Sequence, residues 1–194
     1  MTANSTLRYG TVAMAFHWAI AAAILFMLWL GPFIASLPET DARQFPLFQL
    51  HKSIGLSILI LSLLRLGWRV LHPVPALPSH MARWERAAAR GVHAVFYLLM
   101  IAVPLLGWAS VSAAPLGVPT MWFGLFEWPH IPMLDYLPRA EKRILDPLLI
   151  RTHGLFAFAM LGLVVLHVLA ALKHHFRDRD NVLKHMLPWT TLEP

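Results

Sequence analysis

The sequence predicts an all-α integral membrane protein, a bundle of four transmembrane helices that forms one domain over residues 1–194. Three observations lead to this fold class. First, 58% of the residues are hydrophobic, well above the share in ordinary soluble domains. Second, the chain has four apolar stretches, each close to the ~20 residues that a transmembrane helix needs. Third, Lys and Arg residues gather in alternate connecting segments, as they do between membrane-spanning helices.

The four apolar stretches lie near residues 12–37, 51–70, 91–113 and 151–174. The first follows a basic residue, as a signal peptide does, but its apolar run is too long for one, so we expect a retained helix. In the third, Pro104 and Gly107 predict a kink. We also expect a short surface helix near residues 81–90 and a long aromatic loop from 115 to 149, either functional or interfacial.

The distribution of positive charge predicts the orientation. Placing both termini in the cytoplasm puts ten of the 16 Lys and Arg residues in inner segments and six in outer ones. Because this excess favours the cytoplasmic side, the orientation with both termini inside is expected. The net charge of +6 therefore reflects topology, and we expect no nucleic-acid partner.

Cysteine usage and the missing nucleotide motifs exclude several functions. The chain has no cysteine, which rules out thiolate-bound iron–sulfur clusters, a covalently attached c-type haem and disulfides. It also carries neither a P-loop nor a glycine fingerprint for dinucleotides. If the protein does redox chemistry, its electrons must come from a small diffusing donor, a quinol or another subunit.

Two histidines, His153 and His167, mark the fourth apolar stretch. Fourteen residues separate them, which on an α-helix corresponds to about 21 Å along the axis and only about 40° around it. A histidine buried in lipid needs a partner, a cavity or a metal. For either residue alone, a hydrogen-bonded core histidine is the simpler interpretation. Two imidazoles at two depths on one helix face, however, suit two haems stacked across the bilayer.

The first and second stretches supply histidines at matching depths. His17 lies near the inner end of the first, where a histidine also suits the interface, and His51 lies at the outer end of the second. Because helix directions alternate, His17 pairs with His167 and His51 pairs with His153. Two axial histidines per haem b suit electron transfer, since no axial position remains for a substrate. Zinc fits less well, because its structural sites usually have four protein ligands.

Three further residues are candidates for binding haem propionates or a quinone. Arg65 lies fourteen residues after His51, so we expect it to face inward at the other depth and to pair with an anion such as a propionate. Arg69, one turn later, suits this role or a membrane anchor equally well. His93, near the inner end of the third stretch, suits a propionate, a quinone or a plain interfacial position.

Together these motifs resemble the bacterial cytochrome b561 family, four-helix di-haem proteins of the inner membrane, over nearly the whole chain. The resemblance rests on HW at His17–Trp18, HKSIGLSILILSLLRLGWR from His51, HAVFYLLMIAVPLLG from His93, THG and LH at His153 and His167, and HHFRDRDNVLKHMLP in the tail. It implies a multi-pass protein of the bacterial inner membrane. It also implies that the axial ligands are the four histidines that spacing selects.

Within this family, the resemblance points to superoxide oxidases, which pass electrons from superoxide through the haems to ubiquinone. It implies that Lys52, Arg151 and Arg143 attract superoxide to the outer haem, although four acidic residues in the long outer loop weaken this attraction. The alternative is an anchor subunit that carries electrons between quinone and a periplasmic dehydrogenase or hydrogenase partner. A haem-free structural bundle would leave the aligned histidines unexplained.

Overall fold

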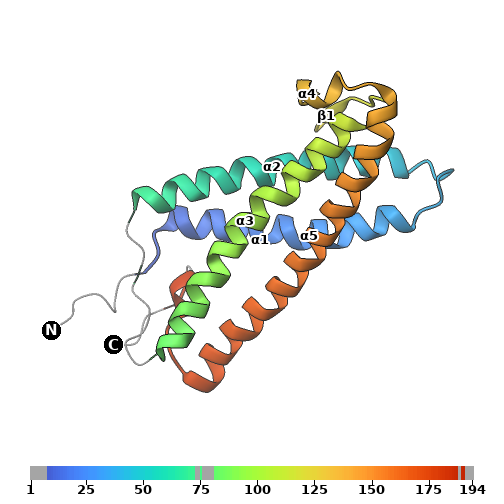
Figure 1. The fold of residues 1–194 in the computed structure, drawn as a ribbon. Coiled ribbons are helices and arrows are strands. Elements are labelled where there is room, and N and C mark those ends of the chain that lie inside the picture. Colours follow the sequence, from blue (N-terminus) through green and yellow to red (C-terminus); the bar gives the residue numbers. More distant parts are fainter. Residues whose placement is uncertain (1–7, 73–74, 76–80, 188, 191–194) are drawn as a thin grey trace.

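Four long helices form a membrane bundle (Figure 1). The computed structural model describes residues 8–72, 75, 81–187 and 189–190. The long helices are α1 (Thr11–Ser36), α2 (Gln44–Leu71), α3 (Arg83–Ala113) and α5 (Arg139–Lys173). Each is long and apolar enough to cross a membrane. The prediction of a helical membrane bundle with four spans is confirmed.

Three of the long helices begin before the apolar stretches that predicted them. α2 begins at Gln44 rather than near residue 51, and α5 begins at Arg139 rather than near residue 151. Hydropathy marks only the part of a helix that crosses lipid, whereas helical structure continues into polar turns beyond it. The first three turns of α5 therefore occupy part of the segment that we expected to be a loop.

α3 also begins early and absorbs the surface helix expected near residues 81–90. It starts at Arg83, and the Glu85 carboxylate accepts a hydrogen bond from the Ala82 backbone amide at 3.2 Å. This contact satisfies one of the free amides at the helix start. The surface helix and the third transmembrane helix are thus one continuous element.

The connection between α3 and α5 is folded rather than irregular. β1 (Thr120–Trp122) and β2 (Phe126–Trp128) form an antiparallel hairpin, and the short helix α4 (Pro132–Asp135) follows. The turn places Phe123 and Gly124 at positive φ, as type I′ turns require. Glycine adopts this conformation readily, whereas phenylalanine rarely does.

Polar residues on α2 hold the hairpin against the bundle. Ser53 is 1% exposed, and its hydroxyl accepts a hydrogen bond from the Phe123 amide and lies 3.1 Å from the Met121 carbonyl. Gln49 donates to the Pro119 carbonyl and accepts from the Met121 amide. These bonds satisfy both the strand backbone and the polar first turns of α2, so the hairpin covers that end of the helix.

The bundle has two ends, which we name by their contents. The hairpin end holds the connection at residues 37–43 and the segment at 114–138, and the tail end holds residue 8 and the segments at 174–187 and 189–190 (Figure 1). At the tail end, Trp18 of α1 donates from Nε1 to the Met186 carbonyl at 2.8 Å. The beginning and the end of the described chain therefore meet at one end of the bundle.

An apolar layer separates the two ends inside the bundle. Its buried core consists of Ile20, Leu99, Met100 and Met160, which come from α1, α3 and α5. Large apolar side chains on the outer faces of the helices are exposed, as lipid-facing residues are. Met160 lies seven residues from each histidine of α5, so the layer crosses the bundle midway between them.

Candidate haem-binding sites

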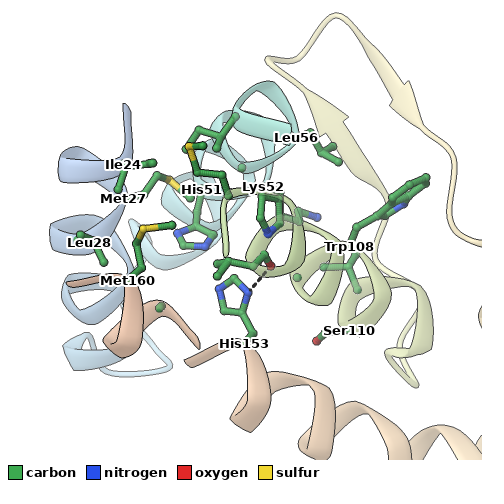
Figure 2. A pocket seen from close by; sticks show the side chains of 18 of the residues that line it. Ile24, Met27, Leu28, His51, Lys52, Leu56, Trp108, Ser110, His153 and Met160 are labelled. Carbon is green, nitrogen blue, oxygen red and sulfur yellow. Dashed lines mark hydrogen bonds between the residues drawn. The ribbon is translucent and has the colours of Figure 1, made fainter. Parts of the chain in front are cut away.

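His51 of α2 and His153 of α5 face each other near the hairpin end (Figure 2). Their ring centroids are 6.1 Å apart and their ring planes differ by 67°. His153 donates from Nδ1 to the Val103 carbonyl of α3 at 2.9 Å, which leaves the Nε2 lone pair free. His51 Nδ1 is buried without a hydrogen-bond partner in the described part of the chain. We call these two residues the hairpin-end pair.

The hairpin-end pair lies in an apolar cavity of about 260 Å³. The cavity is far larger than a water site and approaches the size of small-molecule pockets. Residues from all four long helices line it, among them Met27, Gly55, Trp108 and Met160. The walls therefore suit a bulky, flat and mostly apolar ligand that reaches both imidazoles.

His17 of α1 and His167 of α5 form a second pair near the tail end. Their ring centroids are 6.3 Å apart and their planes differ by 66°. His93 of α3 lies just as close to His167, with ring centroids 6.0 Å apart, and donates from Nδ1 to the Ala89 carbonyl at 2.7 Å. The structure thus gathers three histidines at this depth. The same depth argument applied to the third stretch would have placed His93 at the depth of this pair.

Two arginines accompany this tail-end cluster. Arg65 Nη2 lies 3.2 Å from His17 Nδ1, and because a guanidinium only donates, the histidine nitrogen is the acceptor. The guanidinium groups of Arg65 and Arg69 each lie 5.8 Å from the centre of the Tyr97 ring. Neither arginine pairs with a carboxylate among the residues that the structure describes. Two partly buried cations thus lie beside the cluster without an anionic partner there.

Of the three basic residues considered for attracting superoxide, the structure brings only Lys52 to the cavity. Lys52 is 7% exposed, lines the cavity and donates from Nζ to the Pro119 carbonyl at 3.0 Å. Arg143 and Arg151 are exposed on α5 and do not line the cavity. Burial of Lys52 follows from the hairpin, which sequence patterns did not predict.

A polar cluster behind the hairpin was also missed from the sequence. Asp135 of α4 lies 3.3 Å from His130 Nδ1 and 3.3 Å from the Nζ of the buried Lys142. The hydrogen bond from His130 and then that from Lys142 hold the pKa of Asp135 below its ordinary value. The cluster ties α4 to the start of α5 and so stabilises the folded connection.

The separation of the rings in each pair fits a shared metal ion. A metal–imidazole bond is about 2.0–2.1 Å long and the bound nitrogen lies about 1.1 Å from the ring centre, so two rings on opposite sides of one metal would have centroids about 6.3 Å apart. The observed separations are 6.1 Å and 6.3 Å. Three features of the hairpin end suit a haem. His153 has a free Nε2, and His51 has a buried Nδ1 without a hydrogen-bond partner in the described residues. The cavity around both rings is apolar.

Comparison with known proteins identifies the family. The model of the prokaryotic cytochrome b561 family matches residues 8–189. The chain belongs to the prokaryotic cytochrome b561 family. Members of this family are multi-pass proteins of the bacterial inner membrane that bind haem b and transfer electrons.

Individual b561 relatives cover almost the whole chain. Cytochrome b561 homolog 2 of Escherichia coli is 36% identical over 185 residues, which is 95% of this chain and 93% of the relative. A protein of Yersinia pestis named probable superoxide oxidase CybB is 27% identical over 93% of this chain and 96% of its own length. Cytochrome b562 of Cereibacter sphaeroides is 27% identical over 92% of this chain and 94% of its own length.

Proposed function

We propose that the protein is a di-haem electron-transfer protein that oxidises superoxide and reduces ubiquinone. Two superoxide ions each lose one electron and become O₂, and one ubiquinone gains the two electrons and two protons to become ubiquinol. One observation carries this proposal: two closed histidine pairs lie at two depths of a four-helix membrane bundle. A relative named probable superoxide oxidase supports the choice of donor.

The four histidines are the proposed axial ligands. His51 and His153 would hold one haem b, and His17 and His167 would hold the other. When bound, haem b supplies one-electron redox chemistry. Because both histidines of a pair would be engaged in holding the haem, neither would be free to bind superoxide. For His17 to bind through Nε2, Arg65 has to release Nδ1, since only one ring nitrogen of a neutral imidazole carries the proton.

The tail-end residues have distinct proposed roles. Arg65 and Arg69 bind haem propionates, because two guanidinium groups without a carboxylate partner in the described residues suit anionic oxygens. His93 suits the quinol form of the quinone better than a propionate. Its Nδ1 is committed to the Ala89 carbonyl, so Nε2 of the neutral ring accepts hydrogen bonds, as a quinol hydroxyl requires and a carboxylate does not.

We place the hairpin end in the periplasm and the tail end in the cytoplasm, following the excess of Lys and Arg at the tail end. Superoxide then meets the hairpin-end pair and quinone takes protons from the cytoplasmic side. Lys52 is the one cationic side chain among the cavity-lining residues, so it attracts the superoxide anion to the cavity. The apolar walls keep bulk water away from the hairpin-end pair.

A second candidate function is an anchor subunit that passes electrons between quinone and a periplasmic dehydrogenase or hydrogenase. The observation in its favour is the exposed apolar surface at the hairpin end, where Leu116, Met133 and Tyr136 are 88%, 78% and 85% exposed. Such surfaces occur at protein interfaces as well as at membrane interfaces. An anchor would accept electrons from quinol or its partner and would not respond to superoxide.

Stopped-flow absorbance of the purified, haem-loaded protein separates the two functions. Mixing with superoxide should reduce the haems rapidly, and later addition of ubiquinone should reoxidise them. Superoxide dismutase in the first mix is the control and should abolish the reduction. Haems that respond to quinol alone would contradict the superoxide oxidase and favour the anchor subunit.

We expect Lys52→Gln to lower the second-order rate of haem reduction by superoxide about tenfold at low ionic strength, the lower end of typical electrostatic steering. The loss should shrink as salt is added, because salt screens the attraction. The matched control is Arg151→Gln, which removes an exposed charge outside the cavity. Equal rate losses in the two variants would show that net charge, not Lys52, attracts superoxide.

A further inference from the structure

Gly107 on α3 lies directly behind the imidazole of His153. A Cβ atom at Gly107 would lie 3.2 Å from Cε1 and 3.3 Å from Nδ1 of that ring. Both separations are shorter than ordinary van der Waals contacts between carbon atoms, so any side chain here would push the ring away or force α3 and α5 apart. The bare backbone of Gly107 therefore defines how closely the ring approaches α3.

The same stretch of α3 also holds the ring by a hydrogen bond. His153 Nδ1 donates to the Val103 carbonyl at 2.9 Å, and Val103 lies four residues before Gly107, one turn away on the same helix face. The hydrogen bond sets which nitrogen carries the proton and limits rotation of the ring. The Pro104–Gly107 segment, in which the sequence predicted a kink, is thus the surface on which His153 rests.

Of the two histidine pairs, only the hairpin-end pair has a glycine of the described chain close to each imidazole ring. Of the ten glycines, all of them in the described part of the chain, only Gly31 and Gly107 would bring a Cβ within 4 Å of a histidine ring. Gly31 of α1 lies behind His51, at 3.5 Å from Cε1 and 3.9 Å from Nδ1, which is ordinary contact distance. The His51 ring therefore packs against the backbone at Gly31 of α1, and the His153 ring packs more tightly against the backbone at Gly107 of α3.

We propose that the Val103 carbonyl and Gly107 set the orientation of the His153 imidazole and, with it, the angle between the two axial rings of the hairpin-end haem. The inference rests on the proposed function, because it assumes that His51 and His153 bind one haem. Gly107 is a positioning residue in this scheme and contacts the imidazole, not the haem. The 67° between the ring planes is the quantity that this contact controls. Ring orientation affects the electronic structure of a six-coordinate ferric haem, so the contact also tunes its reduction potential.

The test is electron paramagnetic resonance and redox titration of haem-loaded Gly107→Ala. We expect a shift in the g-values and the midpoint potential of the hairpin-end haem, with the tail-end haem unchanged. The signal that disappears in His153→Ala identifies the hairpin-end haem. Gly162→Ala is the matched control, since a Cβ at this α5 position meets nothing within 4 Å. If Gly107 only stabilised the fold, Gly107→Ala would lower the stability of the protein and would not shift the g-values and potential of the hairpin-end haem alone.

Two outcomes would overturn the inference. Wild-type g-values and potentials in Gly107→Ala would show that the glycine does not set the ring, and equal shifts at both haems would show a general disturbance of the bundle. If Gly107→Ala does not fold, the wild-type spectrum tests the inference instead: rings held 67° apart should give a highly anisotropic low-spin ferric signal for the hairpin-end haem, and a signal typical of parallel rings would overturn the inference. The haem content of the wild type is measured first: fewer than two haems would contradict the proposed function itself, whereas two normal haems with unmoved signals contradict only this inference.

Discussion

Replacing His153 with alanine should halve the haem content of the purified protein. His153 is one of two rings at the hairpin end, and no third histidine lies beside it and His51 among the described residues. A metal that loses one of its two protein ligands in an apolar cavity loses most of its affinity. His167 of the tail-end pair lies fourteen residues further along the same helix, beyond the apolar core layer, so the tail-end haem should remain.

Haem per polypeptide, measured by absorbance of the extracted pigment, checks this prediction. His72→Ala is the matched control, because His72 stacks on Trp68 outside both pairs and its loss should leave the haem content unchanged. Equal loss of both haems from His153→Ala that still folds as a helical protein would contradict the pairing of the histidines.

Replacing His167 with alanine should also halve the haem content, but through the tail-end haem. His167 contacts two histidine rings, at 6.3 Å for His17 and 6.0 Å for His93, so every possible pair at this depth includes it. We expect His17→Ala to lose the same haem. His93→Ala should keep both haems and slow their reoxidation by ubiquinone, because we assign His93 to the quinone.

Comparing these three variants decides which histidine completes the tail-end pair. Haem content and the rate of reoxidation by ubiquinone are measured for each. If His93→Ala loses a haem while His17→Ala keeps it, His93 rather than His17 is the axial ligand. That result would also move the quinone away from His93 and leave His17 as the partner of Arg65 that the structure shows.

The fold and the depths of the histidines could be predicted because both depend on local geometry. A run of apolar residues long enough for the bilayer predicts a spanning helix whatever its neighbours are. The rise and twist of an α-helix convert the spacing of His153 and His167 into depth and direction. Alternating helix directions then place His17 and His51 level with them, and the structure brings together the rings of both pairs.

The folded hairpin and the neighbours of each site residue depended on contacts between residues that are distant in the sequence. Ser53 and Phe123, seventy residues apart, fold the hairpin over α2 and bury Lys52, and no local pattern encodes that meeting. The approach of His93 to His167 and of Gly107 to His153 likewise depends on how α3 packs against α5. The sequence by itself determined the number of membrane-spanning helices, the apolar part of each and the depth of each paired histidine. Only the tertiary structure decided which side chains share a site. Helical periodicity gives the depth and direction of a side chain on its own helix, whereas packing between helices decides which helices, and so which side chains, lie next to one another.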